Sequence, residues 1–311
     1  MRIAIIGSGS VGCLYGARLA RIGHDVHFLM RRDLEAVRRN GLTIRSCDGD
    51  FHLAAQAHGR PEEIGEADLV LCSLKTTALD DAERLIRPCV GPRTDVVALM
   101  NGLGVEDRFV EWFGPDRVFG GLAFVCINRG EPGIVHHYGY GRVMFGHWQN
   151  DLARARRIAD LFEAAGFETS VAPSLLRARW EKLVWNIPFS TLTVSAGAVT
   201  TAQIMEHPGL RELALHLMEE TIAAGNAQLP PEQRMIPGPL IDKMFANTST
   251  MGAYRPSMLV DYTERRALEV ESILGEPVRR AERLAVPVPC MRMQYHLVSF
   301  LDRRNRGLVQ I

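Results

Sequence analysis

The chain has 311 residues, of which 47% are hydrophobic and 23% are charged, so its composition is that of an ordinary globular protein. At roughly 150 residues per domain, this length favours two domains. Lys+Arg and Asp+Glu both number 36, and the resulting net charge of zero argues against a nucleic-acid partner. No apolar run approaches the roughly 20 residues that span a bilayer, so no membrane partner is expected.

The N-terminus and the cysteines predict a cytoplasmic protein without a metal. The apolar run Arg2–Ile6 is too short for a signal-peptide core and lacks a cleavage pattern. The six cysteines are scattered with no C-x-x-C pair, so neither a zinc site nor a disulfide framework is expected. The adjacent pair His136 and His137 has poor ligand geometry on a strand or a helix.

The first half alternates apolar strands with helical patterns, the rhythm of a parallel sheet covered by helices. Strands are expected at Arg2–Ile6, Val26–Met30, Leu69–Ser73, Val96–Met100, Val118–Val125, Ile134–Tyr138 and Val143–Gly146. Helices are expected at Val11–Ile22, Thr77–Ile86 and Val105–Phe113. This pattern predicts an α/β domain over residues 1–172.

After Pro173 the strand signal almost disappears, and helical periodicities are broken only by Pro and Gly. Helices are expected at Leu175–Trp185, Met205–Ala224, Leu240–Phe245, Ser257–Leu274 and Cys290–Arg304. Pro188 removes a backbone donor and is expected to kink the first of them. Leu229–Pro239 is expected to form a long loop. The second domain, residues 173–311, is therefore predicted to be all-α.

Residues 7–12 match G-x-G-x-x-G, directly after the first predicted strand and at the start of a helix. In that setting the pattern indicates a dinucleotide site, with the pyrophosphate on the helix N-terminus. The first glycine permits a tight turn, the second lets the backbone approach the pyrophosphate, and the third lets helix and strand pack closely. The expected cofactor contacts are Gly7, Ser8, Gly9, Ser10, Val11 and Gly12.

The end of the second predicted strand selects the cofactor. NAD sites carry an acidic residue there for the ribose 2′-hydroxyl. Here the strand is followed by Arg31, which can pair with a 2′-phosphate, so NADP(H) is favoured over NAD. Asp33 lies further along and is expected to cap a helix.

Lysine is rare in this chain and occurs only at positions 75, 182 and 243. Unlike arginine, it can lose its proton near working pH. Lys182, Asn186 and Ser190 are spaced i, i+4 and i+8, which aligns an ammonium, an amide and a hydroxyl on one helix face. The apolar neighbours favour a buried polar stripe that needs a partner such as a substrate, against the alternative of a solvated amphipathic helix.

Several motifs occur in an order that resembles the ketopantoate reductase (2-dehydropantoate 2-reductase) family. They are the glycine loop, Leu74-Lys75, Asn101-Gly102-Leu103-Gly104, Trp180-Glu181-Lys182-Leu183 with Asn186, and Ser257-Met258-Leu259 with Glu269. The resemblance spans nearly the whole chain. It implies a Rossmann-type domain joined to a helical domain of the 6-phosphogluconate dehydrogenase C-terminal type. The implied activity is NADPH-dependent reduction of a 2-keto acid to a 2-hydroxy acid in pantothenate biosynthesis, on the route to coenzyme A.

The resemblance also implies a catalytic role for two residues. Lys182 matches the lysine that donates a proton to the developing alkoxide, and Glu269 matches the carboxylate near the nicotinamide and that lysine. The pKa of the lysine should be lowered by desolvation, with Glu269 opposing that shift. Alternatively, Glu269 is a surface partner of Arg265 or Arg266.

Binding roles follow in the same way. Arg31 and Lys75 match cofactor-binding positions, and Asn101 matches an asparagine that contacts both cofactor and substrate. Asn186 and Ser257 match substrate-binding positions, Ser257 for the carboxylate. Ser190 also belongs to the expected substrate site, where pantothenate-pathway enzymes carry a second asparagine.

Two other functions are consistent with the sequence. One is a related NADP-dependent dehydrogenase acting on another 2-keto or hydroxy acid, for which Ser190 is the discriminating feature. The other is a non-catalytic NADP(H)-binding regulator, which the presence of Lys182, Asn186 and Glu269 disfavours. A homodimer is expected only by analogy with similar two-domain reductases.

Overall fold

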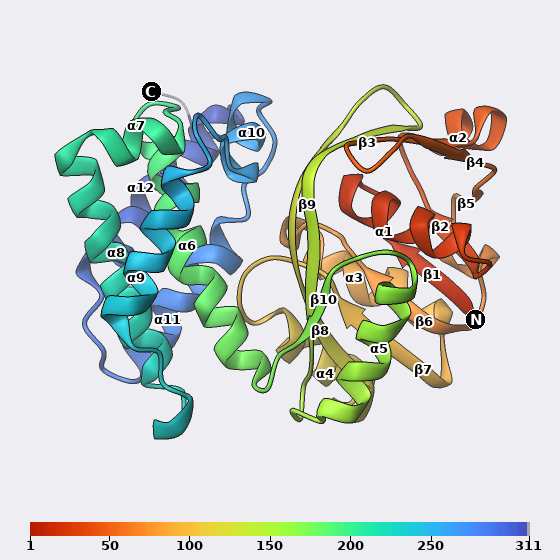
Figure 1. The fold of residues 1–311 in the computed structure, drawn as a ribbon, viewed down its shortest axis with the longest axis horizontal. Helices are drawn as coiled ribbons and strands as arrows, with labels where there is room; N and C mark the ends of the chain where they lie inside the picture. The colour runs from red at the N-terminus through yellow and green to blue at the C-terminus, as the bar shows by residue number, and fades with distance from the viewer. Residues whose placement is uncertain (310–311) are drawn as a thin grey trace. The chain divides into compact units, whose positions relative to one another are not determined.

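The computed structural model describes residues 1–309, which divide into two compact units. The first unit comprises Met1–Met100 and Val105–Leu175. The second begins at Leu176 and also includes the short segment Asn101–Gly104. In Figure 1 the chain passes from strands and helices in red to yellow into green and blue helices. The predicted domain boundary between residues 172 and 173 stays a prediction. Dividing the chain at one point along the sequence also could not predict that residues 101–104 belong to the second unit.

The first unit is built on one sheet whose strand order is β4-β3-β9-β8-β7-β6-β1-β2-β5, with β10 paired to β9. The strands are β1 (Arg2–Ile6), β2 (Asp25–Leu29), β3 (Leu42–Ser46), β4 (Phe51–Leu53), β5 (Gln56–His58), β6 (Ala67–Cys72), β7 (Val90–Ala98), β8 (Val118–Arg129), β9 (Ile134–His147) and β10 (Thr169–Val171). The central strands β1, β2, β6 and β7 are parallel. Their apolar runs are buried because helices cover a parallel sheet on both faces.

Five α-helices belong to this unit: α1 (Ser10–Arg21), α2 (Leu34–Asn40), α3 (Leu79–Ile86), α4 (Val105–Phe113) and α5 (Leu152–Ala164). The α/β expectation is confirmed, although α2, α5 and the strands β3–β5 and β10 were not foreseen. The two strands expected at 134–138 and 143–146 are one strand, β9. The pairing of β9 with β8 shifts register at the glycine-rich residues near Tyr140, and these bulges let β9 continue through them.

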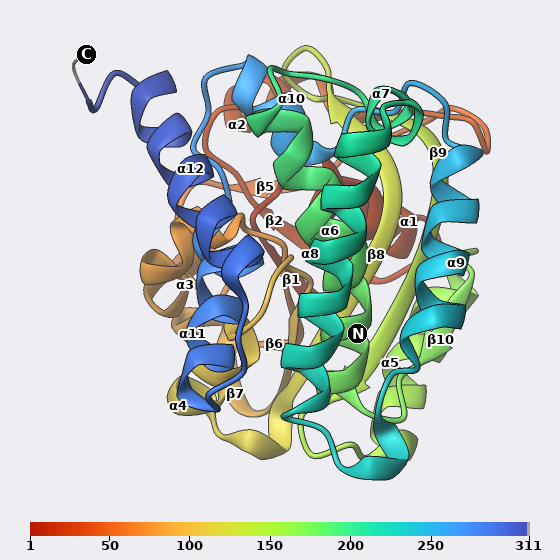
Figure 2. The same ribbon diagram turned by 90° about the vertical axis from the view of Figure 1, so that its left-hand side faces the viewer.

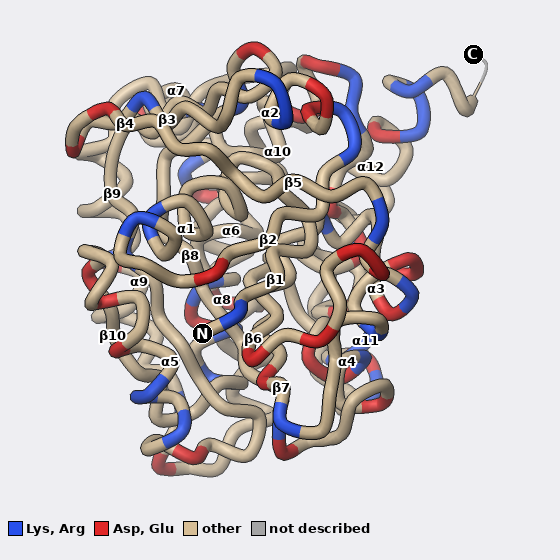
Figure 3. The backbone as a smooth tube through the Cα atoms, turned by 90° about the vertical axis from the view of Figure 1, so that its right-hand side faces the viewer, with Lys and Arg blue, Asp and Glu red and all other residues tan. Residues whose placement is uncertain are grey.

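Charges of both signs are interspersed along the first unit's elements in Figure 3. Many of these charges are paired, as in Arg154 with Asp95 at 3.0 Å and Arg45 with Asp50 at 2.7 Å. This distribution agrees with the net charge of zero.

The second unit is helical, as predicted. Its elements are α6 (Leu175–Ser195), α7 (Thr201–Glu206), α8 (Pro208–Asn226), α9 (Pro237–Ser249), α10 (Ser257–Thr263), a π-helical turn (Glu271–Gly275), α11 (Glu276–Arg283) and α12 (Pro289–Asn305) (Figure 2). None of the helices within residues 1–309 is long and apolar enough to cross a membrane.

Three helix predictions in this half need correction. The helix expected at 205–224 is two helices, because Pro208 starts α8 and the His207 side chain accepts a hydrogen bond from the Leu210 N–H. The helix expected at 257–274 ends at Thr263, and Arg265 has φ +54° in the connection that follows. The helix that begins at Leu175 continues through Pro188 to Ser195.

The core of the second unit is centred on Trp180 in α6, which is fully buried. Leu183, Val184 and Ile187 follow it on the same helix and are also buried. Gly225 of α8 faces the indole, and a Cβ placed there would lie 2.9 Å from the Trp180 ring. This close approach fixes the part of α6 that carries Lys182.

The Gly225–Trp180 contact predicts a stability effect. Gly225→Ala should lower the free energy of unfolding by about 1–3 kcal/mol, because the methyl group overpacks the core. Gly209→Ala in the same helix is the matched control, since its Cβ would meet only His207 at 3.5 Å. Urea unfolding of both variants checks this. Equal stability of the two variants would contradict the packing argument.

Candidate active site

The glycine loop between β1 and α1 has the geometry of a nucleotide cradle. Gly7 has φ +94°, and a Cβ there would lie 2.6 Å from the Leu74 nitrogen. A Cβ at Gly12 would lie 2.3 Å from the Ser73 hydroxyl oxygen. At Gly9, by contrast, the nearest atom would be 4.0 Å away, so the chain leaves this face of the loop open. Two glycines are thus required by packing, and the third leaves room for a ligand to approach the backbone.

The N-terminus of α1 is suited to an anion. Gly9 is its N-cap, no side chain caps the helix, and no acidic residue lies in its first turn. The free N–H groups and the positive end of the helix dipole can therefore bind a pyrophosphate. Ser8 contributes through its backbone, because its hydroxyl donates to the Ile5 carbonyl at 3.4 Å. Its own carbonyl accepts a hydrogen bond from Arg129 at 3.1 Å.

The other predicted cofactor residues lie at the same edge of the sheet. Strands β1, β2 and β6 are parallel neighbours, so their carboxyl ends meet there, as in dinucleotide-binding folds. Arg31 lies two residues beyond the end of β2, and Lys75 lies three residues beyond the end of β6. Both side chains are exposed. The residues therefore fit a dinucleotide with an additional phosphate.

Asp33 occupies the N-cap position of α2, as expected, but it caps the helix through its backbone carbonyl alone. It precedes α2, but its side chain makes no capping hydrogen bond. Instead the buried carboxylate accepts from Arg32 Nε at 2.8 Å and lies 3.9 Å from Arg129 Nε. Pairing with two guanidinium groups explains why this carboxylate is buried.

The second unit brings together three predicted site residues from distant parts of the chain. Lys182 Nζ donates to Asn101 Oδ1 at 3.0 Å. Asn101 Nδ2 donates to Glu269 Oε2 at 3.4 Å. The amide thus connects a cation to a carboxylate by accepting on one side and donating on the other.

The backbone after Asn101 explains why its side chain is held in place. Gly102 has φ +86°, and a Cβ there would lie 2.5 Å from Ser272 Cβ. The Leu103 N–H donates to the Ser272 carbonyl at 2.8 Å. Ser272 lies in the π-helical turn that directly follows Glu269 and Val270. The same short segment therefore anchors the asparagine and supplies its acidic partner.

The ammonium of Lys182 has an unusual protonation equilibrium. Its pKa is lowered to about 7, chiefly by burial and also by the charge of nearby Arg179, while Glu269 acts in the opposite direction. The expected lowering by desolvation, opposed by Glu269, agrees with this result. The Lys182 residue as a whole is partly exposed, although its ammonium group is buried.

Arg179 is a charged neighbour of Lys182 that the sequence reasoning missed. It is only 2% exposed and lies three residues before Lys182 on α6. That spacing places two cationic side chains on neighbouring positions of one helix face, which is a signal that could have identified it. The positive charge of Arg179 disfavours the protonated, positively charged form of Lys182.

The alternative assignment of Glu269 to a surface ion pair is not supported. Glu269 is only 7% exposed. Arg266 instead pairs with Asp261, its Nε lying 2.8 Å from the carboxylate, and with Glu264. Glu269 accepts a hydrogen bond from Asn101 and interacts electrostatically with Lys182.

The remaining predicted substrate residues also lie in the second unit. Asn186 and Ser190 follow Lys182 by one and two turns of α6, Asn186 partly exposed and Ser190 only 3% exposed. Ser257 is the first residue of α10 and is exposed. Their roles in binding stay predictions.

A glycine-rich nucleotide cradle and a buried lysine of near-neutral pKa together define the class of two-domain, dinucleotide-dependent oxidoreductases. The family model "Ketopantoate reductase PanE/ApbA" matches residues 3–150, and the model of its C-terminal domain matches residues 174–302. The chain belongs to the ketopantoate reductase family.

Known relatives agree with this assignment over nearly the whole chain. The sequence is 38% identical to 2-dehydropantoate 2-reductase from Nostoc sp., covering 98% of this chain and 96% of the relative. A crystal structure of 2-dehydropantoate 2-reductase from Geobacter metallireducens is 43% identical, with a TM-score of 0.93 and coverage of 96% and 99%. D-mandelate dehydrogenase has the same fold, with a TM-score of 0.88 at 19% identity and coverage of 98% and 99%. The chain is an NADP-dependent oxidoreductase, as its family is.

The Gly102 contact predicts an effect on catalysis. Gly102→Ala should displace Asn101 and lower kcat roughly ten- to hundredfold, since small misplacements of catalytic groups are costly. Gly114→Ala is the matched control, because Gly114 has the same φ of +86° but nothing within 4 Å of its Cβ position. Steady-state kinetics of both variants separates the local clash from backbone strain. A similar kcat for the two would contradict the positioning argument.

Proposed function

We propose that this protein reduces 2-dehydropantoate to pantoate with NADPH, in pantothenate biosynthesis. The observation that carries the proposal is the hydrogen-bonded arrangement of Lys182, Asn101 and Glu269, with a lysine pKa of about 7. The 38% identity to a 2-dehydropantoate 2-reductase supports the choice of substrate.

NADPH, when bound, supplies the hydride for the keto carbon. Lys182 stabilises the negative charge that grows on the keto oxygen and donates its proton there. Asn101 accepts a hydrogen bond from the ammonium and orients it. Glu269 favours the protonated lysine, whereas burial and Arg179 favour its release of the proton. A near-neutral pKa lets the lysine act as an acid and be reprotonated at working pH.

The first unit is assigned to the cofactor. The backbone of residues 7–12 and the start of α1 would hold the pyrophosphate, and Arg31 would pair with the 2′-phosphate. Lys75 and Asn101 are assigned further cofactor contacts, and Glu269 is placed near the nicotinamide. These assignments follow from the family pattern and from the open face at Gly9.

The second unit is assigned to the substrate. Asn186 and Ser257 are proposed to bind the 2-keto acid, Ser257 through its carboxylate. Ser190 is proposed to contact the far hydroxyl, where its single hydroxyl is shorter than the asparagine expected at this position. Lys182 and Asn101 complete the substrate contacts.

The cellular location and the oligomeric state of the protein are also proposed here. The biosynthetic role supports a location in the cytoplasm, and a homodimer is proposed by analogy with the dimeric ketopantoate reductase from Staphylococcus aureus, which is 19% identical to this chain. Sedimentation velocity of the purified protein would measure the oligomeric state.

The direct test of the proposed function is loss of reduced-nicotinamide absorbance with 2-dehydropantoate. We expect turnover that is selective for NADPH. Arg31→Ala should reduce the preference for NADPH over NADH about tenfold or more, because it removes a hydrogen bond to a charged group, which contributes about 1.5–3 kcal/mol. NADPH binding without turnover of 2-dehydropantoate, but with turnover of another 2-keto acid, would assign the enzyme to that substrate. No turnover of any 2-keto acid would contradict the catalytic proposal.

The role of Lys182 predicts a selective loss of turnover. Lys182→Met should lower kcat by about 10²–10⁴-fold, because a positioned general acid contributes that much. The dissociation constant for NADPH, measured by nucleotide fluorescence, should remain unchanged. Lys243→Met is the control, since Lys243 is exposed on α9. A variant at position 182 with near wild-type kcat would exclude Lys182 as the proton donor.

The pKa of Lys182 predicts a pH profile. Reduction requires the protonated lysine, so kcat should fall as pH rises above about 7. The reverse reaction requires the neutral amine and should fall as pH decreases below that value. Arg179→Gln removes a positive charge that lowers this pKa, so the descending limb should move to higher pH. An unchanged limb in a folded Arg179→Gln protein would disprove the electrostatic coupling.

A further inference from the structure

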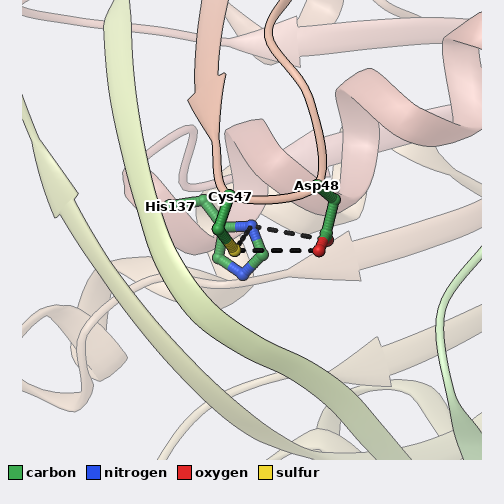
Figure 4. Close-up of side chains that lie close together, drawn as sticks. All are labelled: Cys47, Asp48 and His137. Carbon is green, nitrogen blue, oxygen red and sulfur yellow. Dashed lines mark hydrogen bonds and ion pairs between the residues drawn. The ribbon is translucent and has the colours of Figure 1, made fainter.

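Three side chains of types that can ligate a metal converge in the first unit, outside the residues assigned to the reaction. Cys47 and Asp48 form the turn directly after β3, and His137 lies in β9 (Figure 4). The two segments are held together by parallel pairing of Ser46 with His137 and by a hydrogen bond from the Cys47 N–H to the His137 carbonyl at 3.0 Å. The backbone therefore fixes the positions of the three side chains.

The donor atoms have the mutual spacing of a metal-ligand set. Cys47 Sγ lies 3.8 Å from His137 Nδ1 and 3.7 Å from Asp48 Oδ1. His137 Nδ1 lies 3.8 Å from Asp48 Oδ2. Ligands of a tetrahedral ion at bond lengths of about 2.0–2.3 Å lie about 3.3–3.6 Å apart. Small side-chain movements would bring the three atoms into that geometry.

The orientation of His137 favours its use as a ligand. Its side chain is fully buried, and Nε2 lies 3.2 Å from the Tyr140 carbonyl oxygen. A carbonyl only accepts, so Nε2 carries the proton, and Nδ1, which lies 3.8 Å from both Cys47 Sγ and Asp48 Oδ2, keeps its lone pair. Metal-binding histidines are oriented by this type of second hydrogen bond. Tyr140 adopts φ +62°, an uncommon conformation for a non-glycine residue, in presenting that carbonyl.

Two neighbouring groups interact with the cluster. Arg18 Nη2 pairs with Asp48 Oδ2 at 2.5 Å, and the guanidinium carbon of Arg18 lies 4.6 Å from the centre of the Phe167 ring. Oδ1 of Asp48 remains directed toward the cysteine sulfur. The Ser46 hydroxyl lies 2.9 Å from His137 Nδ1 and would have to rotate away when the nitrogen binds an ion.

We propose that Cys47, Asp48 and His137 form a binding site for a divalent transition-metal ion, zinc foremost. Thiolate, imidazole and carboxylate donors together suit zinc, whereas magnesium and calcium prefer oxygen donors. Cys47 and Asp48 are exposed, so an ion can enter and water can complete the tetrahedron. The site clamps the turn after β3 to β9. It departs from the expectation of no metal, which considered ligand spacing only along the chain.

The test uses cobalt(II) as a spectroscopic probe of the full-length protein, after reduction and removal of metals with a chelator. One equivalent of Co²⁺ should produce the near-ultraviolet charge-transfer absorption of a cobalt–thiolate bond, and zinc should displace it. Cys47→Ser should abolish this absorption, and His137→Gln should weaken cobalt binding at least tenfold. Cys290→Ser, which removes another partly exposed thiol, is the matched control and should leave the absorption unchanged.

The variants remain interpretable because Cys47 is exposed and the Cys47→Ser substitution is nearly isosteric. Its melting temperature without metal and its reductase kcat should match those of the wild type. Zinc should raise the melting temperature of the wild type but not that of Cys47→Ser, since only a folded site binds the ion. Absence of the thiolate absorption in the wild type, or its persistence in Cys47→Ser, would overturn the proposal.

Discussion

The side-chain amide of Asn101 is the interaction on which the catalytic arrangement depends. It accepts from the Lys182 ammonium at 3.0 Å and donates to the Glu269 carboxylate at 3.4 Å. An asparagine can do both at once, whereas an aspartate could only accept and would place a second negative charge beside Glu269. The three residues come from segments far apart in the sequence. The fold of the second unit therefore has to position each segment before the proton donor can work.

The electrostatics of this arrangement oppose its stability. A buried ammonium loses hydration, and a second cation three residues away on the same helix adds repulsion. The protein accommodates this cost by anchoring the same turns of α6 in an apolar core around Trp180. The result is a lysine whose pKa of about 7 suits proton transfer. The cost is the loss of the hydration that a surface lysine would keep.

The features that sequence reasoning predicted are those set by local spacing. The glycine loop needs only six residues and its flanking strand and helix. Lys182, Asn186 and Ser190 share a helix face because four residues make slightly more than one turn. Long-range features were not accessible. The spacing of Arg179 and Lys182 is local, but the burial of Arg179 comes from tertiary packing, and the Cys47, Asp48 and His137 cluster depends on pairing between β3 and β9. No periodicity in one segment carries information about such contacts.

The helix predicted at residues 257–274 is interrupted in the structure, and this interruption positions one of the site residues. Apolar spacing favoured one helix, but the chain leaves it after Thr263, with Arg265 at φ +54° and the Leu268 N–H bound to Asp302 at 3.0 Å. The chain then re-enters helical structure through the π-helical turn, whose Ser272 carbonyl accepts from Leu103. An uninterrupted helix would direct Glu269 by the helical repeat alone. The irregular segment instead aims its carboxylate at Asn101, so the departure from local preference is part of how the site is built.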